Sequence, residues 1–219
     1  MIYRREKWAN AKIGVTVLMA GCLLIARAAG AEELRSGVYA LRTVPGADLD
    51  HRKVYIAVDK GQVTGYFDNP FTTPAENIPD RDPTCRFLFK GASAPDGKLQ
   101  VTTFFAGKLG ASLALSPGNV GVWSVHVDGD LPNCEVPTLE SGDSLTLEST
   151  RNWIGFASIA SARATLFVGP ADGARTKAYL VRDDVVAVLQ KEDKWVQVDY
   201  FQRGKDVVRW VSTRDLARQ

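Results

Sequence analysis

The chain has 219 residues, of which 45% are hydrophobic and 24% charged, and its formal net charge is +2. This composition is typical of a globular protein and excludes a disordered or collagen-like chain. Residues 1–31 hold five basic side chains and one acidic one, which leaves 22 basic and 24 acidic side chains in residues 32–219. Because nucleic-acid binding depends on Lys and Arg neutralising phosphates, this near-neutral balance argues against a nucleic-acid partner.

The first 31 residues have the pattern of a secretory signal peptide. A basic stretch, residues 1–12, precedes an uncharged apolar run, residues 13–26, and small residues follow up to Ala31. The apolar run is shorter than the roughly 17 to 25 residues of a membrane-spanning helix, so we expect cleavage after Ala31 and no membrane span afterwards. Cys22 follows Met-Ala-Gly, which leaves a lipid anchor at Cys22 as an alternative. The expected location is the bacterial periplasm or the cell exterior.

Two cysteines remain beyond residue 31, namely Cys85 and Cys134. In an oxidising compartment such a pair is expected to form a disulfide, which would close a loop of about 50 residues. The alternative is a catalytic thiol with His51 or His126 as its base. Nucleophilic cysteines are usually activated at a helix N-terminus, whereas Cys85 precedes a run with the pattern of a strand, so the disulfide is the favoured interpretation.

Short β-branched and aromatic runs alternate with Gly, Pro and Asp turns through residues 32–159, which predicts an all-β domain. The predicted strands are residues 38–42, 54–58, 63–67, 86–89, 99–105, 112–115, 122–127 and 144–147. Asp59-Lys60-Gly61 lies between the second and third runs and predicts a hairpin in which Gly61 adopts the left-handed conformation. No amphipathic helical pattern of ten or more residues occurs, so we expect a small β-barrel or sandwich.

Residues 69–84 differ from the rest because they contain four prolines, at positions 70, 74, 79 and 83. Proline cannot donate a ladder hydrogen bond, so this stretch is expected to be an ordered loop. Long loops of this kind can form a binding lip or a cover over a barrel mouth, but a rigid crossover held by the neighbouring Cys85 is the favoured interpretation.

The last third of the chain, from about residue 163, has a distinctive spacing of apolar and aromatic residues. The positions concerned are Ala164, Leu166, Phe167, Pro170, residues 178–181, Asp184, Val185, residues 195–198, Trp210, Val211, Asp215 and Leu216. In this spacing the segment resembles a bacterial SH3-like domain, with Asp183 and Arg209 standing where such domains commonly have glycine. The resemblance implies a C-terminal SH3-like β-barrel over residues 160–219 that binds peptidoglycan or an envelope protein and is not itself an enzyme.

Side chains alternate along residues 195–200, which places Val196 and Val198 on one face of a strand and Trp195 on the other. If the valines fill the core, Trp195 lies near the surface, where aromatic rings can form a platform for a sugar or a peptide. The alternative is that each aromatic ring only caps the small barrel. The candidate ligand-binding residues are Tyr179, Trp195, Tyr200 and Trp210.

Charge is distributed unequally between the two expected domains. Residues 32–159 carry 11 basic and 16 acidic side chains, whereas residues 160–219 carry 11 basic and 8 acidic ones. Random variation of surface residues is the favoured explanation of this difference. The alternative is that a cationic C-terminal domain attracts an anionic cell-wall polymer, with a strength that depends on salt. The residues between the domains, 152–156, are largely apolar, so we expect the two domains to pack closely.

Catalytic motifs are missing from the sequence. His51 and His126 do not have zinc-site spacing, and no nucleophile elbow, phosphate-binding loop or dinucleotide fingerprint occurs. The acidic pairs Asp80 with Asp82 and Asp128 with Asp130 do not match a calcium loop. We therefore expect no enzyme activity, metal or cofactor.

Three classes of function are compatible with these observations. The favoured one is an exported, non-enzymatic binding protein of the bacterial envelope. The second is an inhibitor or immunity protein of a cell-wall-degrading enzyme, with residues 69–84 inserted into the enzyme's cleft. The third is a cell-wall hydrolase or its accessory, targeted by the SH3-like module, which would need a free thiol or an activated hydroxyl.

Overall fold

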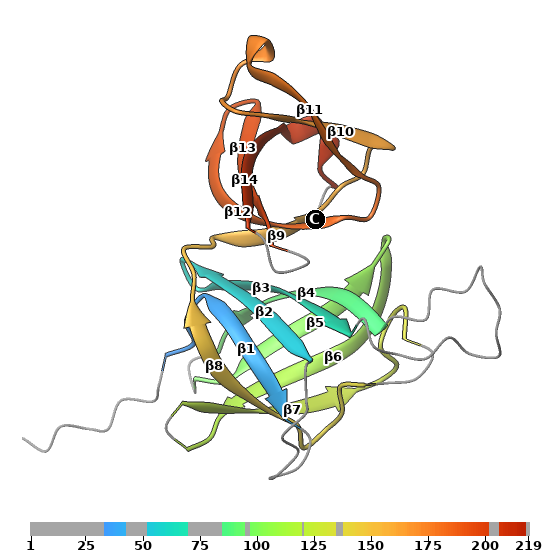
Figure 1. Ribbon diagram of the computed structural model, residues 1–219. Coiled ribbons are helices and arrows are strands. Elements are labelled where there is room, and N and C mark those ends of the chain that lie inside the picture. Colours follow the sequence, from blue (N-terminus) through green and yellow to red (C-terminus); the bar gives the residue numbers. More distant parts are fainter. Residues whose placement is uncertain are drawn as a thin grey trace, which may run out of the picture. The chain divides into compact units, whose positions relative to one another are not determined.

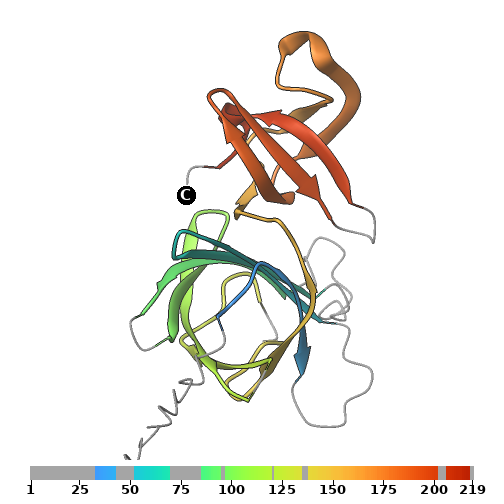
Figure 2. The ribbon, with the colours of Figure 1, turned by 90° about the vertical axis from the view of Figure 1, so that its left-hand side faces the viewer.

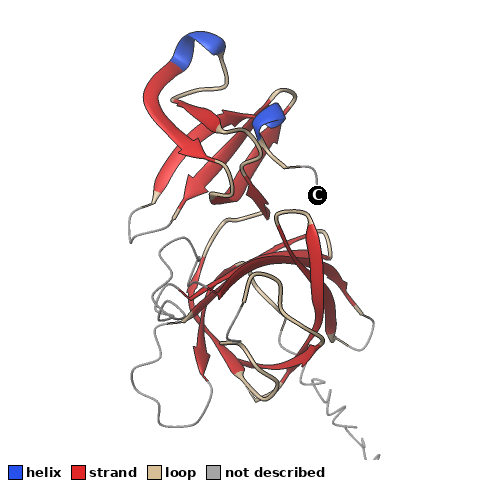
Figure 3. Ribbon diagram, turned by 90° about the vertical axis from the view of Figure 1, so that its right-hand side faces the viewer, coloured by secondary structure: helices blue, strands red, loops and turns tan. Residues whose placement is uncertain are grey.

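The computed structural model describes residues 33–42, 52–69, 85–94, 97–119, 121–134, 138–201 and 206–217. Within these ranges the chain forms fourteen β-strands and two one-turn 3-10 helices, and the expected all-β fold is confirmed (Figure 3). No helix in the described ranges has the length and apolar character needed to cross a membrane.

The first eight strands form a closed antiparallel barrel, in which each strand pairs with the next and β8 pairs back with β1 (Figures 1 and 2). The strands are β1 Gly37–Arg42, β2 Lys53–Asp59, β3 Gln62–Asn69, β4 Cys85–Ser93, β5 Leu99–Phe105, β6 Lys108–Pro117, β7 Val122–Asp128 and β8 Ser144–Thr150. Each of the eight strands predicted for this part of the sequence lies inside one of them. Of the two architectures expected here, a barrel and a sandwich, the barrel is found.

The barrel interior is a packed core. Side chains that point inward from the strands form one buried cluster, which includes Tyr39, Leu41, Ile56, Phe67, Phe87, Phe89, Leu99, Leu113, Leu115 and Leu145. The rings of Phe67 and Phe87 lie 5.2 Å apart at their centroids. Large aromatic and branched side chains of this kind fill the inside of an eight-stranded barrel.

The β2–β3 hairpin follows its prediction. Lys60 and Gly61 occupy the two turn positions with φ of 50° and 77°, and Asp59 pairs with Gln62. Positive φ at both central residues is the geometry of a two-residue hairpin turn. Further along β3, a Cβ at Gly65 would lie 1.9 Å from the Phe89 ring. Only glycine at this position leaves room for the ring in the core.

The predicted disulfide between Cys85 and Cys134 is present. Cys85 opens β4 and is buried in the barrel core, while Cys134 follows the loop after β7. Of the proline-rich stretch, the structure describes only Asn69, the last residue of β3, and residues 70–84 lie outside the described ranges. His51, Asp80 and Asp82 lie outside them as well.

The remaining strands form a six-stranded antiparallel sheet in the order β11-β10-β14-β13-β12-β9 (Figure 1). The strands are β9 Gly155–Ser158, β10 Arg163–Phe167, β11 Arg175–Val181, β12 Val185–Glu192, β13 Trp195–Tyr200 and β14 Val207–Ser212. The 3-10 helices, Asp172–Ala174 and Thr213–Asp215, flank β11 and β14. This second sheet begins with β9, ahead of residue 160, because β9 pairs with β12.

The second sheet has its own core, to which Val196 and Val198 contribute as the alternation predicts. The turn between β11 and β12 places Asp183 at φ 68°, a left-handed conformation, with the Asp184 N–H donating to the Val181 carbonyl at 3.1 Å. Aspartate tolerates this conformation better than most residues other than glycine. The turn thus accommodates Asp183 without a glycine at this position.

Trp153, between β8 and β9, joins the barrel to the second sheet. It lies in a third buried cluster with Tyr66 and Leu88 of the barrel and with Ala187 and Phe201 of the C-terminal part. The Trp153 ring is 5.3 Å from that of Phe201 and 5.4 Å from that of Phe156, centroid to centroid. This packing agrees with the apolar character of residues 152–156.

Removal of the disulfide should destabilise the barrel without changing its topology. For a bridge between residues 49 apart in sequence, the loss of the cross-link is expected to cost about 4 kcal/mol through the greater chain entropy of the unfolded state. Urea unfolding of C85A/C134A, compared with the oxidised wild type, measures this cost. Equal unfolding free energies in the two proteins would contradict it.

Replacement of Trp153 by alanine should destabilise the barrel and the second sheet together. The cavity left in the shared cluster is expected to cost about 3–5 kcal/mol. The measurement is denaturant unfolding of W153A, followed both by far-UV circular dichroism and by fluorescence of the remaining tryptophans. A single transition shifted to lower denaturant is expected, whereas two separate transitions in the wild type would show that the two parts unfold independently.

Candidate functional site

The four candidate aromatic residues occupy different environments in the second sheet. Tyr179 on β11 is 47% exposed, and Trp195 at the start of β13 is half-buried. Tyr200 at the end of β13 is also half-buried, while Trp210 on β14 is only 8% exposed. The sequence prediction that Trp195 stays near the surface therefore agrees with its position.

Trp195 and Trp210 share the outer face of the sheet with a residue that the sequence analysis did not select, Phe167. The Trp195 and Phe167 ring centroids are 4.7 Å apart in an edge-to-face arrangement. Trp210 pairs in register with Phe167 on one side and with Gln197 on the other. Directly opposed residues of neighbouring strands lie on the same face, so the three rings gather on one side of the sheet.

Tyr200 is separated from this group. It ends the strand that Trp195 begins, and a six-residue strand spans about 17 Å. Its side chain packs against the core of the second sheet, beside residues such as Val198. The four candidates do not form a single platform, and Tyr200 has a packing role.

Basic side chains accompany the exposed aromatic surface. The Arg163 guanidinium carbon lies 3.8 Å from the centroid of the Tyr179 ring, and that of Arg175 lies 5.9 Å from the Phe167 centroid. Both are cation–π contacts, which leave guanidinium N–H groups free to bind an anion. We refer to the surface formed by Arg163, Arg175, Tyr179 and Trp195 as the aromatic–basic face. The Phe167 ring supports this face but is itself only 5% exposed.

The charge of this face is uncompensated. Strands β10 and β11 contain Arg163, Arg175 and Lys177 but no Asp or Glu. Within the described part of the chain none of these three cations has an ion-pair partner. Unpaired cations beside exposed rings suit a ligand that carries both carboxylates and flat apolar surfaces.

A cleft beside Trp153 is the second candidate. It has a volume of about 320 Å³ and is lined by Val38, Lys53, Tyr55, Arg151, Trp153, Phe201 and Asp206. Burial, with the added effect of the Asp68 and Glu148 charges, raises the pKa of Tyr55 to about 12, so its phenol stays protonated at neutral pH. The cations of this cleft already have partners, because Lys53 pairs with Glu148 and Arg151 with Asp206. This cleft therefore offers fewer unpaired cations to a ligand than the aromatic–basic face does.

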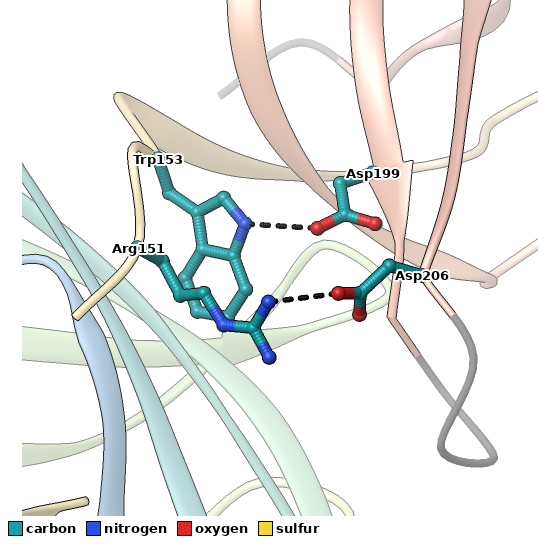
Figure 4. A network of polar contacts seen from close by, with 4 residues as sticks. All are labelled: Arg151, Trp153, Asp199 and Asp206. Atoms are coloured by element: carbon teal, nitrogen blue, oxygen red, sulfur yellow. Dashed lines mark hydrogen bonds and ion pairs between the residues drawn. The ribbon is translucent and has the colours of Figure 1, made fainter. Parts of the chain in front are cut away.

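Three residues that line this cleft, Arg151, Trp153 and Asp206, form a polar network with Asp199 (Figure 4). The Trp153 Nε1–H donates to Asp199 Oδ2 at 3.1 Å, and Arg151 Nη1 donates to Asp206 Oδ2 at 2.7 Å. Asp199 lies on the face of β13 opposite Val198, yet it is only 4% exposed because the Trp153 cluster covers it. Its other oxygen, Oδ1, has no hydrogen-bond partner among the described residues.

Burial raises the pKa of the Asp199 carboxyl above its ordinary value, and the Asp206 charge acts in the same direction. The Trp153 hydrogen bond and the Arg151 charge lower this pKa but do not offset the burial. The folded state thus binds the Asp199 proton more tightly than the unfolded chain does. Ionisation of Asp199 therefore lowers the stability of the folded state, although the ionised carboxylate accepts the hydrogen bond from Trp153.

His126 on β7 is exposed, as its position opposite Val125 predicts. Its Nδ1 lies 3.2 Å from Ser141 Oγ, the one described arrangement that resembles a serine–histidine pair. Ser141 Oγ also accepts a hydrogen bond from the Val127 N–H at 2.8 Å and lies 3.2 Å from the Val127 carbonyl oxygen. These contacts hold the hydroxyl against the β7 backbone, so we assign Ser141 a structural role.

Metal coordination has no support in the described part of the chain, where no group of three or more His, Cys, Asp or Glu side chains is placed to hold an ion. Asp128 and Asp130 are both exposed. The disulfide occupies the two cysteines that a thiol mechanism would use.

The pKa of Asp199 leads to a pH-dependent prediction. The contribution of Asp199 to stability should be fully present below the ordinary aspartate pKa of 3.8 and should be lost as the pH rises through the higher pKa of the folded state. D199N removes the buried charge and keeps an oxygen for the Trp153 N–H. It should therefore equal or exceed the wild type in stability at neutral pH, with a difference that shrinks in acid.

Urea unfolding of D199N and the wild type across the acidic range measures this difference. D199A is the contrasting variant, because it leaves the Trp153 N–H unpaired and should be less stable than D199N by about 1–3 kcal/mol. Parallel pH profiles for D199N and the wild type would show that Asp199 does not titrate as described.

Comparisons of the chain with protein-family models, with curated proteins and with solved structures found no match in any of the three.

Proposed function

We propose that the protein is an exported, non-enzymatic binding protein of the bacterial envelope, which docks on peptidoglycan through the aromatic–basic face of its second sheet. The observation that carries this proposal is the set of unpaired cations on β10 and β11 beside exposed or half-buried rings. Peptidoglycan combines sugar rings, which pack on aromatic side chains, with peptide carboxylates, which guanidinium groups bind well.

Two further observations support the proposal. A disulfide persists in oxidising compartments such as the periplasm, and the Cys85–Cys134 bond agrees with the export expected from the N-terminal pattern. The short antiparallel strands β10–β14 suit the SH3-like barrel that the sequence resembles, a fold found in binding modules. An envelope protein is the alternative ligand of the same module.

Co-sedimentation with purified peptidoglycan tests the proposal, using the chain from residue 32 onward. Truncation near residue 161 is unsuitable, because β9 and Trp153 belong to the second sheet and to the shared cluster. The informative variant is R163Q/Y179A, which removes the stacked cation–π pair from the surface. We expect it to bind about tenfold more weakly, since it loses one aromatic contact and one exposed charge.

The matched control is K191Q, which removes one positive charge from an exposed position on β12 of the same sheet. It should bind as the wild type does, and added salt should weaken binding of both proteins. Failure of the wild type to sediment with peptidoglycan would overturn the assignment of this ligand. Equal losses in K191Q and R163Q/Y179A would show that the attraction is not localised on the aromatic–basic face.

A further inference from the structure

Strand β11 forms one end of the second sheet. It pairs with β10 along one side, and its other side has no strand neighbour in the part of the chain that the structure describes. The strand at the opposite end, β9, is held against the barrel, where the Phe156 N–H donates to Thr64 Oγ1 at 3.1 Å. The open hydrogen-bonding edge of this sheet is therefore the edge of β11 up to Leu180. At Val181 the N–H donates to Asp184 Oδ2 at 2.8 Å and the carbonyl accepts from the Asp184 N–H at 3.1 Å.

The side chains of β11 favour one kind of neighbour. Arg175, Lys177, Tyr179 and Val181 are all exposed, the last two at 47% and 45%. The strand thus displays two cations at its start and two apolar surfaces towards its end, and Arg163 of β10 adds a third cation against the Tyr179 ring. These four residues are two apart and share one face of the strand. A neighbouring strand would therefore be attracted most if acidic side chains lay opposite Arg175 and Lys177 and apolar ones opposite Tyr179 and Val181.

We propose that β11 accepts an extended segment of a partner protein, acidic in one half, as an additional antiparallel strand. Backbone hydrogen bonds to the open edge supply the attraction common to all strand additions. The cations of β11 supply the selectivity, because a basic or neutral segment gains no ion pair. A second copy of β11 would bring further cations and no acidic residue to this edge, so self-association through it gains no ion pair.

This inference rests on the proposed role of the second sheet as the binding module, and it adds a partner class and a mode of contact. Peptidoglycan would meet the side chains of the aromatic–basic face, whereas a peptide strand would meet the backbone of β11. The two kinds of binding can therefore be separated experimentally.

The test uses isotope-labelled protein from residue 32 onward and a synthetic peptide of about eight residues, blocked at both ends. The peptide has valine at positions 1 and 3, glutamate at positions 5 and 7 and threonine between them, so that in an antiparallel pair valine lies opposite Val181 and Tyr179 and glutamate opposite Lys177 and Arg175. Nuclear magnetic resonance should show chemical-shift changes and slower amide hydrogen exchange confined to β11 and its neighbour β10. A peptide with glutamine in place of glutamate should bind more weakly. A peptide with glutamate retained but alternate backbone nitrogens methylated cannot form the ladder and should lose binding.

Substitutions in the protein give the reciprocal test. R175Q/K177Q should weaken peptide binding about fivefold, the effect of removing two exposed ion pairs. The control K191Q/K194Q removes the same charge from exposed positions in and after β12 and should leave peptide binding unchanged.

Three results would overturn the inference: no binding of the acidic peptide, equal binding of the methylated peptide, or shift changes located in the barrel strands. Peptidoglycan sedimentation of the same preparations separates this failure from failure of the proposed function. Loss of peptide binding with intact peptidoglycan binding removes only the strand addition, and the opposite pattern removes only the peptidoglycan assignment.

Discussion

The burial of Trp153 is the constraint on which the rest of the structure depends. This side chain is 2% exposed, and its indole N–H needs a partner inside the cluster that joins the barrel to the second sheet. Asp199 supplies that partner across 46 residues of sequence. Hydrophobic packing alone is compatible with several ways of docking a barrel on a sheet, but a buried donor is satisfied only where the acceptor lies within reach. The Trp153–Asp199 hydrogen bond therefore determines which of the possible arrangements of barrel and sheet is adopted.

The same junction determines which surfaces stay available for binding. One face of the second sheet is filled by its own core, and Val185, Ala187 and Asp199 are covered by the Trp153 cluster. The edge strand β9 is bonded to the barrel through Thr64. The side of β10 and β11 remains open, and unpaired cations and exposed rings coincide there. The barrel serves as a stable support, since its interior is filled by side chains and its end strands are paired with each other.

Asp199 gives the junction a built-in dependence on pH. A carboxylate at this position accepts the Trp153 bond but loses its hydration, and the pKa rises because the second effect is larger. A neutral side chain of the same shape would hold the indole without that cost. An aspartate at this position therefore makes the folded state less stable than a neutral side chain of the same shape would. In some proteins buried ionisable groups are retained for reasons other than stability.

The sequence by itself determined the all-β class, the strands of the barrel, the hairpin at Gly61 and the disulfide, because each follows from local pattern or from the two cysteines that lie beyond the predicted signal peptide. The tertiary structure alone decided that Phe167 joins Trp195 and Trp210, and that Arg163 meets Tyr179. Those neighbours depend on the register of β10 with β11 and β14, which shifts between Thr165 and Phe167. It also decided that Asp199 is buried, because alternation places this residue on the face of β13 away from the core, and only packing from a distant segment covers it.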